Sequence, residues 1–160
     1  MSTPTSSSTT KLPRLLGLII IIFGAVFFVA GATTWTAVSV NLKAENITVS
    51  DDAAAFAGGA VDTPWEAFAQ ADIIKHHALD ATGGKTYAEL DKEDPLRAVA
   101  MNGSFLRASL FTSVIAFGVA LFAVGVGAIS ILLGWGLRLL GTAAPAAVAT
   151  TAKAAETATA

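Results

Sequence analysis

The sequence predicts an all-α fold: an integral membrane two-helix hairpin with a small helical extracytoplasmic module between the spans. Three observations predict this class. The chain of 160 residues is 54% hydrophobic and only 14% charged, which is more apolar than an ordinary soluble domain. Two uncharged apolar blocks, Leu15 to about Ala37 and Ala108 to about Leu137, each exceed the roughly 20 residues that cross a bilayer as a helix. The residues between them carry helix start and stop signals.

The N-terminal part of the chain predicts a tail and a first span. Residues 1–12 are mostly small and polar and predict a disordered cytoplasmic tail, and residues 13–38 predict the first transmembrane helix. Basic residues just before an apolar run also occur in signal peptides, and Ala30-Gly31-Ala32 offers a cleavage sequence. Because the apolar run continues past that sequence and is long enough to span, we expect an uncleaved anchor.

The segment between the spans, residues 39–107, predicts an extracytoplasmic helical module. It holds six basic and eleven acidic residues, which gives it a charge of about −5. Lys11 and Arg14 precede the first span, and a short basic N-terminus of this kind usually stays in the cytoplasm. We therefore expect a multi-pass protein of the plasma membrane with both termini cytoplasmic. Trp35 and Trp135 are expected at opposite membrane interfaces.

The stretch "ATGGKTYAE" at residues 81–89 contains Gly-Lys-Thr, the end of a phosphate-binding P-loop. That motif needs a glycine five residues before Gly84, where this chain has Leu79, and a strand upstream. Instead, "PWEAFAQADIIKHHALDA" upstream has a helical pattern. The sequence therefore predicts a joint between two helices and no nucleotide binding.

The helix boundaries in the module follow from capping signals. Thr63 to Glu66 reads as a capping box with proline at the first helical position, so a helix is predicted from there to about Ala81. Gly83 and Gly84 are expected to end it. Thr86 to Glu89 reads as a second capping box and predicts a short helix. Asp94-Pro95 predicts the start of a third helix, which continues into the second span.

Two further expectations concern packing within the module. The segment after Asn46 predicts an extended piece, followed by a short helix that Ser50 caps and Gly58 ends. One face of the helix over 64–81 is expected to pack on an apolar stripe of the third helix. The face consists of Trp65, Phe68, Ala69 and Leu79, and the stripe consists of Leu96, Val99, Gly103, Leu106 and Leu110.

Residues 108–138 predict the second transmembrane helix, and residues 141–160 predict a disordered Ala/Thr-rich cytoplasmic tail. Both spans carry small residues at a seven-residue period, which is typical of helices that approach closely in a membrane. In the first span these are Gly17, Gly24 and Gly31. In the second they are Ser109, Ser113, Ala116, Ala120, Ala123, Gly127, Ser130 and Gly134. The pattern leaves open whether the stripes meet within one chain or between chains.

Residues that could carry chemistry are few. The chain has no cysteine, which excludes disulfides and thiolate chemistry, and its net charge of −2 gives no basic face for nucleic acid. Asp72 and His76 lie one helical turn apart and could supply two metal ligands, but a site needs a third from elsewhere. Adjacent side chains on a helix point about 100° apart, so His76 and His77 cannot chelate one ion from that helix. We expect no cofactor and no catalytic residue.

Three stretches carry a resemblance: "ENITVSDD", then "QADIIKHHALDATGGKTYAELDKEDP", then "SFLRASLFTSVIAFGVA". The chain resembles a family of small two-span actinobacterial membrane proteins of unknown function, over about residues 13–140. Members are often labelled aromatic ring-opening dioxygenases, so the resemblance implies an iron-dependent dioxygenase, or a subunit of one, as an alternative function. Such enzymes hold ferrous iron with two histidines and a carboxylate, and no motif of theirs is present onto which a catalytic residue could be carried.

The sequence thus favours a non-enzymatic scaffold or interaction module of the cell envelope. The expected partners are the lipid bilayer and another envelope protein or a second copy of the chain. A small accessory subunit of a transporter is a third hypothesis. Neither span contains an ionisable residue between its flanking basic residues, which argues against an ion path.

Overall fold

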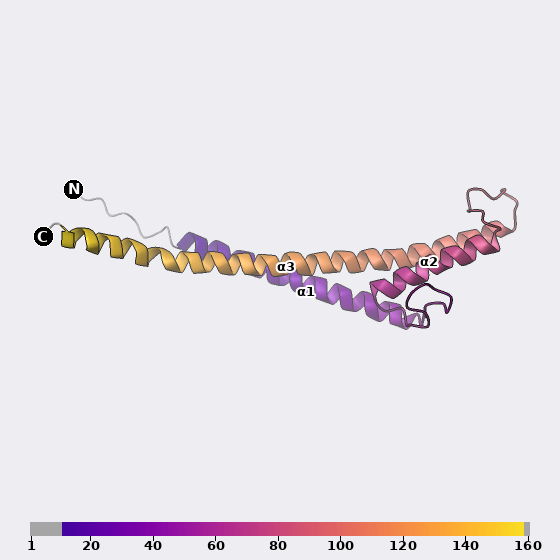
Figure 1. The fold of residues 1–160 in the computed structure, drawn as a ribbon, viewed down its shortest axis with the longest axis horizontal. Helices are drawn as coiled ribbons and strands as arrows, with labels where there is room; N and C mark the ends of the chain where they lie inside the picture. The colour runs from indigo at the N-terminus through magenta and orange to yellow at the C-terminus, as the bar shows by residue number, and fades with distance from the viewer. Residues whose placement is uncertain (1–10, 159–160) are drawn as a thin grey trace. The chain divides into compact units, whose positions relative to one another are not determined.

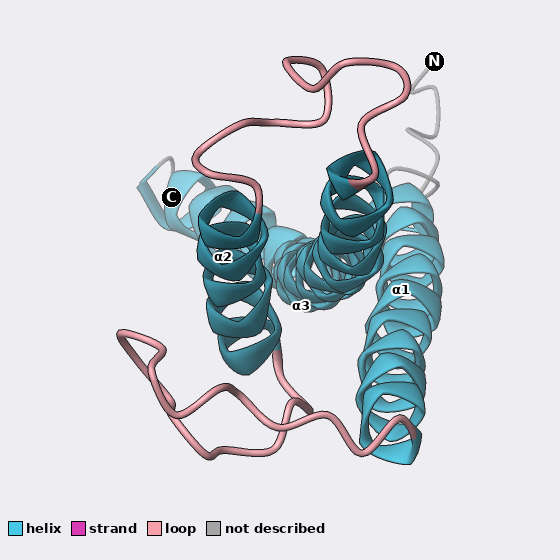
Figure 2. Ribbon diagram, turned by 90° about the vertical axis from the view of Figure 1, so that its right-hand side faces the viewer, coloured by secondary structure: helices cyan, strands magenta, loops and turns pink. Residues whose placement is uncertain are grey.

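The structure, a computed structural model, describes residues 11–158, with side-chain surroundings described up to residue 141. It contains three helices: α1 (Lys11–Ala44), α2 (Pro64–Ala81) and α3 (Leu96–Ala158) (Figure 1). The described part of the chain forms no strand beyond one isolated bridge between Thr48 and Ala60, so the predicted all-helical class is confirmed (Figure 2). Contacts divide the chain into two compact units. Unit 1 comprises residues 11–30 and 123–158 of the described chain, and unit 2 is Gly31–Phe122.

Helices α1 and α3 are each long and apolar enough to cross a membrane. In the most apolar 18-residue stretch of each helix, only 17% of the residues are buried, whereas the core helix of a soluble protein is mostly buried. Many of their large apolar side chains are exposed, among them Leu15, Ile19, Phe23, Phe122, Ile129 and Leu133. The chain therefore has two candidate spans that overlap the predicted ranges 13–38 and 108–138.

The helices α1 and α3 extend into the segments that were predicted to be disordered tails. Lys11 and Leu12 already belong to α1, and residues 1–10 lie outside the described part. Disorder was expected over 141–160, whereas the structure continues α3 to Ala158. Alanine has the highest intrinsic helix propensity, so an alanine-rich segment extends a preceding helix readily. Residues 159–160 lie outside the described part.

Glycines set the packing of α1 against α3 in unit 1. A Cβ added at Gly17 would lie 2.5 Å from the carbonyl oxygen of Gly134, and one added at Gly24 would lie 2.7 Å from that of Gly127. The reciprocal distances, from Gly134 and Gly127 to the α1 carbonyls, are 2.5 and 2.6 Å. Real side chains do not approach backbone atoms this closely, so the two backbones touch only because all four positions are glycine.

The loop between α1 and α2 begins with the predicted extended piece, which pairs antiparallel with the residues just before α2. The Val49 amide donates to the Gly59 carbonyl at 2.8 Å, and the Val61 amide donates to the Ile47 carbonyl at 2.9 Å. Val49 and Val61 are each 1% exposed and belong to the core of unit 2. The short helix expected after Ser50 is absent, because the backbone turns back on itself through Phe56 (φ 59°) and Gly58 (φ 72°).

The bounds of α2 match the predicted range, although its N-terminal cap differs from the expected box. The Thr63 hydroxyl donates to the Glu66 carboxylate and caps no backbone amide. The C-terminal end is confirmed. The Gly84 amide donates to the Leu79 carbonyl at 2.7 Å, and Gly83 and Gly84 have φ of 63° and 83°. This is the six-to-one bond and left-handed turn of a Schellman motif.

The predicted helix from Thr86 is absent, and turns occupy residues 87–89. The Glu89 carboxylate accepts from the Thr86 amide at 2.8 Å and from the Thr86 hydroxyl at 2.7 Å. These bonds lower the pKa of Glu89 below its ordinary value, the backbone bond contributing most. The stretch that resembles a P-loop is therefore a helix end followed by a turn. Asp94 then caps α3 as predicted, accepting from the Leu96 amide at 2.8 Å.

The predicted packing of α2 on α3 is confirmed in part. Of the expected residues, Phe68 contacts Phe111, and Gly103 and Leu110 are buried. Trp65 and Phe68 are exposed, as are Leu96, Val99 and Leu106 of the expected stripe. The buried face instead carries Ala67 and Ala71, both 0% exposed. A Cβ added at Gly103 would lie 2.8 Å from the Ala78 Cβ, and the Arg107 Nε donates to the Ala71 carbonyl at 3.2 Å. Small residues occupy this face because they let the backbone of α2 lie close to the backbone of α3.

Candidate functional site

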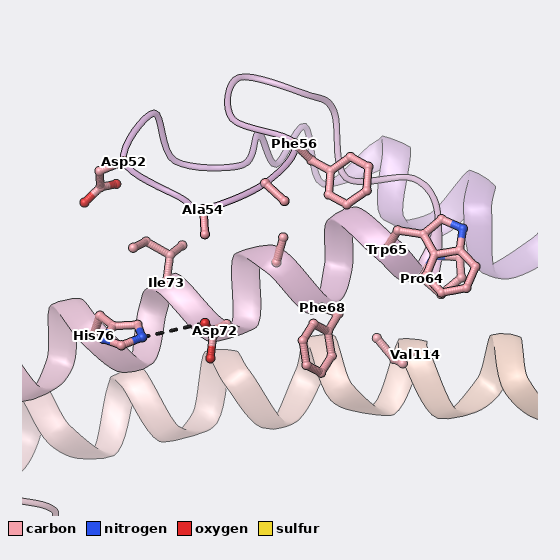
Figure 3. Close-up of a pocket in the computed structure, with 12 residues that line it drawn as sticks. Asp52, Ala54, Phe56, Pro64, Trp65, Phe68, Asp72, Ile73, His76 and Val114 are labelled. Carbon is pink, nitrogen blue, oxygen red and sulfur yellow. Dashed lines mark ion pairs between the residues drawn. The ribbon is translucent and has the colours of Figure 1, made fainter.

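An apolar groove on unit 2 is the main candidate site (Figure 3). It has a volume of about 700 Å³, within the range typical of ligand pockets. Three elements form it: the loop over 45–63, α2 and α3. Its lining comprises Asp52, Ala54, Ala55, Phe56, Pro64, Trp65, Phe68, Ala69, Asp72, Ile73, His76 and Val114.

Large aromatic side chains stand exposed in this groove. Trp65 is 65% exposed, Phe68 53% and Phe56 51%. Phe68 packs edge-on against Phe111 of α3 at 5.8 Å between ring centroids, which fixes its orientation. Exposed apolar surface clustered in this way is typical of a binding surface rather than of ordinary protein exterior.

The groove is polar at one end only. Figure 3 shows Pro64, Trp65, Phe68 and Val114 gathered at one end and Asp52, Asp72 and His76 at the other. This gradient follows α2, because its N-terminal turns carry the aromatic residues and its later turns carry Asp72 and His76. The groove is therefore amphipathic along its length.

Two contacts hold the loop over α2. The Asp52 carboxylate lies 2.7 Å from the His77 Nε2, and the Ser50 amide donates to the Gln70 Oε1 at 2.9 Å. The hydrogen bond from His77 is the largest influence on Asp52 and lowers the pKa of its carboxyl. No local pattern in the sequence indicates Asp52 as a partner of His77, because the two lie 25 residues apart and only the fold of the loop brings them together.

The predicted metal candidates form an ion pair on one face of α2. The His76 Nε2 lies 3.6 Å from the Asp72 Oδ2, and both side chains are exposed. His77 points instead to Asp52, so the adjacent histidines have separate carboxylate partners. Within the described residues, no group of three histidine, cysteine or acidic side chains lies close enough to share an ion.

The small-residue stripes lie in both units. Gly17, Gly24, Gly127 and Gly134 make the close contacts of unit 1, where a Cβ at Gly24 would also lie 2.9 Å from the Ser130 Cβ. Gly31 is buried in unit 2. Ala120 is also buried there, at 1% exposed, and Ala116 of unit 2 and Ala123 of unit 1 are half-buried.

A second groove of about 630 Å³ lies between α1, α2 and α3 in unit 2. Its walls mix apolar residues with polar ones such as Asn41, Glu45 and Gln70. It lacks the cluster of exposed aromatic rings, so we regard the first groove as the stronger candidate.

Comparison of the chain with protein-family models, with curated proteins and with solved structures found no match. The described fold alone gives the class of protein. It is an α-helical protein with two helices able to cross a membrane, and an amphipathic groove lies on the helices and loop between them.

Proposed function

We propose that the chain is an integral protein of the cell membrane that acts by binding and not by catalysis. In this proposal α1 and α3 cross the bilayer, residues 39–107 form a binding module outside, and both termini are cytoplasmic. One observation carries the proposal: the apolar side chains of both long helices are exposed along the candidate spans. Such a surface is unfavourable in water and favourable in lipid.

The short basic N-terminus supports the proposed orientation. In unit 1 the Arg138 side chain lies beside Gly17, with its Cγ 2.8 Å from the Cβ position of that glycine. Gly17 is one turn from Arg14, so basic residues of both helices gather at the same end of unit 1. The opposite flanks of the two spans carry as many basic residues, so the orientation rests on the short basic N-terminus ahead of α1, a type of segment that usually stays in the cytoplasm.

The groove supports binding as the activity of the module. Its apolar walls offer contact area, and its ionisable groups are exposed and paired in the contacts described above. Catalytic carboxylates and histidines are more often partly buried, where their pKa values can be tuned.

The topology can be tested with single cysteines, because the chain has none of its own. An impermeant thiol reagent is applied to intact cells that express Ser7→Cys, Lys85→Cys or Thr150→Cys. We expect only Lys85→Cys to react, and all three to react after the cells are permeabilised. Reaction at either tail in intact cells would overturn the proposed orientation, and extraction of the protein by alkaline carbonate would overturn membrane insertion.

A further inference from the structure

Helix α2 runs antiparallel to the part of α3 on which it packs. Near its N-terminus Phe68 contacts Phe111, and near its C-terminus Ala78 contacts Gly103. The apolar end of the groove therefore lies beside the later of these α3 residues, where Val114 forms part of the lining.

Phe111 and Val114 lie just inside the uncharged run of α3. This run, Ala108 to Leu137, has 30 residues and a length of about 45 Å by helix rise. A bilayer measures about 40–45 Å with its headgroup regions and about 30 Å across its hydrocarbon core. If the run crosses the bilayer, Phe111 and Val114 lie about 5 and 9 Å from its outer end. That depth is the boundary between headgroups and acyl chains.

From its aromatic end to its polar end, the groove changes polarity in the same order as a bilayer surface changes from acyl chains to headgroups and water. Its aromatic end lies at the depth of Phe111 and Val114, and its polar end, with Asp72 and His76, lies further from the run (Figure 3). Trp65 stands at the aromatic end, and tryptophan prefers the membrane interface because its ring is apolar and its N–H is polar. A lipid at the bilayer surface has the same order, with its chain inward and its headgroup outward.

We infer that the groove binds an acyl chain of a membrane phospholipid at the outer surface of the bilayer. The inference rests on the proposed function, because it requires that α3 crosses the membrane. It explains why Trp65, Phe68 and Phe56 stand exposed together: lipid, rather than water, covers them. It also gives the loop over 45–63 a role, since Phe56 closes the groove from the side opposite α3 (Figure 3).

The position of the groove can be measured by tryptophan fluorescence, because the chain has only three tryptophans. Trp35→Phe with Trp135→Phe leaves Trp65 as the only reporter, and phenylalanine at 35 preserves an aromatic contact with Phe117. The protein is reconstituted into phosphatidylcholine vesicles that carry a nitroxide quencher near the headgroup or near the end of the acyl chain.

Two matched reporters, each in a background with all three tryptophans replaced, separate this inference from the proposed function. Phe122→Trp reports the middle of the candidate span, and Tyr87→Trp reports the loop after α2, away from the groove. We expect Trp65 to be quenched several-fold more than Tyr87→Trp by the nitroxide near the headgroup. We expect Phe122→Trp to be quenched most by the nitroxide near the chain end.

Occupancy of the groove is measured separately, as phospholipid retained by the protein in native mass spectrometry. Ala69→Phe fills the groove, and Ala88→Phe adds the same ring on an exposed loop position. We expect Ala69→Phe to lower the retained phospholipid several-fold and Ala88→Phe to leave it unchanged, with equal helix content by circular dichroism.

The outcomes distinguish the two claims. If Phe122→Trp is quenched from the chain end while Trp65 is quenched no more than Tyr87→Trp, the span is correct and the lipid groove is wrong. Equal lipid retention in Ala69→Phe and Ala88→Phe also overturns the groove. If Phe122→Trp is not quenched from within the bilayer, the proposed function fails and the inference fails with it.

Discussion

At the scale of single residues, Asp52 makes one of the contacts between the loop and α2. Its carboxylate contacts His77 at 2.7 Å, and this hydrogen bond lowers its pKa from the ordinary value of 3.8. A carboxyl whose pKa is lowered by folding stabilises the folded state above its unfolded pKa, and this contribution is lost as the pH falls through the lowered value. This one contact therefore weakens as the pH falls below the ordinary value, while the Ser50–Gln70 bond and the buried Val49 and Val61 continue to hold the loop.

We predict that His77→Ala returns the pKa of the Asp52 carboxyl towards its ordinary value. The variant removes the hydrogen bond that lowers this pKa, and because Asp52 is exposed, the effect on global stability should be small. The carboxyl carbon resonance of Asp52, followed against pH by NMR, measures the change. His76→Ala is the matched control and should leave the Asp52 titration where it is. An unchanged titration in His77→Ala would contradict the contact.

The turn at Gly83 depends on backbone conformation alone. A Cβ at this position would meet no atom within 4 Å, but φ is 63°, a conformation that β-branched residues rarely adopt. We predict that Gly83→Val lowers the free energy of unfolding by about 1–2 kcal/mol. Denaturant titration in detergent measures this. Lys85→Ala should change neither stability nor nucleotide response, and ATP binding that Lys85→Ala abolishes would restore the P-loop interpretation.

At the scale of elements, the local signals in the sequence predicted helix bounds better than helix contacts. Pro64 and the Gly83-Gly84 pair predict where α2 begins and ends, because caps depend on a few neighbouring residues. The face of α2 was predicted from its large apolar residues, of which Phe68 contacts α3 while Trp65 is exposed. The fold instead buries Ala67 and Ala71, since close approach of two backbones favours small side chains over large ones.

The groove could not be predicted from the sequence, because it too depends on contacts between residues far apart in the chain. The sequence indicates a helix after Ser50, and only long-range pairing of Val49 with Gly59 turns that segment back over α2. Phe56 and Asp52 reach the groove through this pairing. The aromatic residues of α2 were visible in the sequence, but they were assigned to the core because no local signal marks them as exposed.

Helix contact in unit 1 can be tested with two neighbouring glycines of α3. A Cβ at Gly127 would lie 2.6 Å from backbone atoms of α1, whereas one at Gly125 would meet nothing within 4 Å. We predict that Gly127→Val destabilises the helix pair by about 1–3 kcal/mol, because the backbones must separate. Gly125→Val carries the same change in helix propensity and should cost well under half as much. Unfolding in detergent measures both, and equal effects would show that α1 and α3 do not pack here.

At the scale of the whole molecule, each of the two units exposes apolar side chains. Unit 1 exposes aliphatic and aromatic side chains around a contact made by glycines, which suits a lipid environment on its outer surface. Unit 2 has a small core of its own and exposes aromatic rings in one groove. The proposed placement of the spans in a bilayer and of the groove at its surface accounts for both exposed surfaces.

The alternative function, an iron-dependent ring-opening enzyme, requires an iron site that the whole chain must supply. A facial iron site needs two imidazoles and one carboxylate that converge and leave positions open for substrate and oxygen. The only histidines, His76 and His77, are adjacent on α2 and contact different carboxylates, Asp72 and Asp52. To bind one iron within one chain, both histidines would have to break these contacts, and their side chains would still point in diverging directions.

We therefore predict that the protein, purified without chelators, retains iron far below one atom per chain and does not open catechol-type rings. Two chains could in principle combine their histidines, so the measurement must also be expressed per dimer. Elemental analysis of the wild type is compared with His76→Ala and His77→Ala, and catechol consumption is followed after ferrous iron is added under reducing conditions. About one iron per chain or per dimer, lost in either variant, would refute the binding-module proposal and favour the dioxygenase, because adventitious iron would not depend on these two side chains.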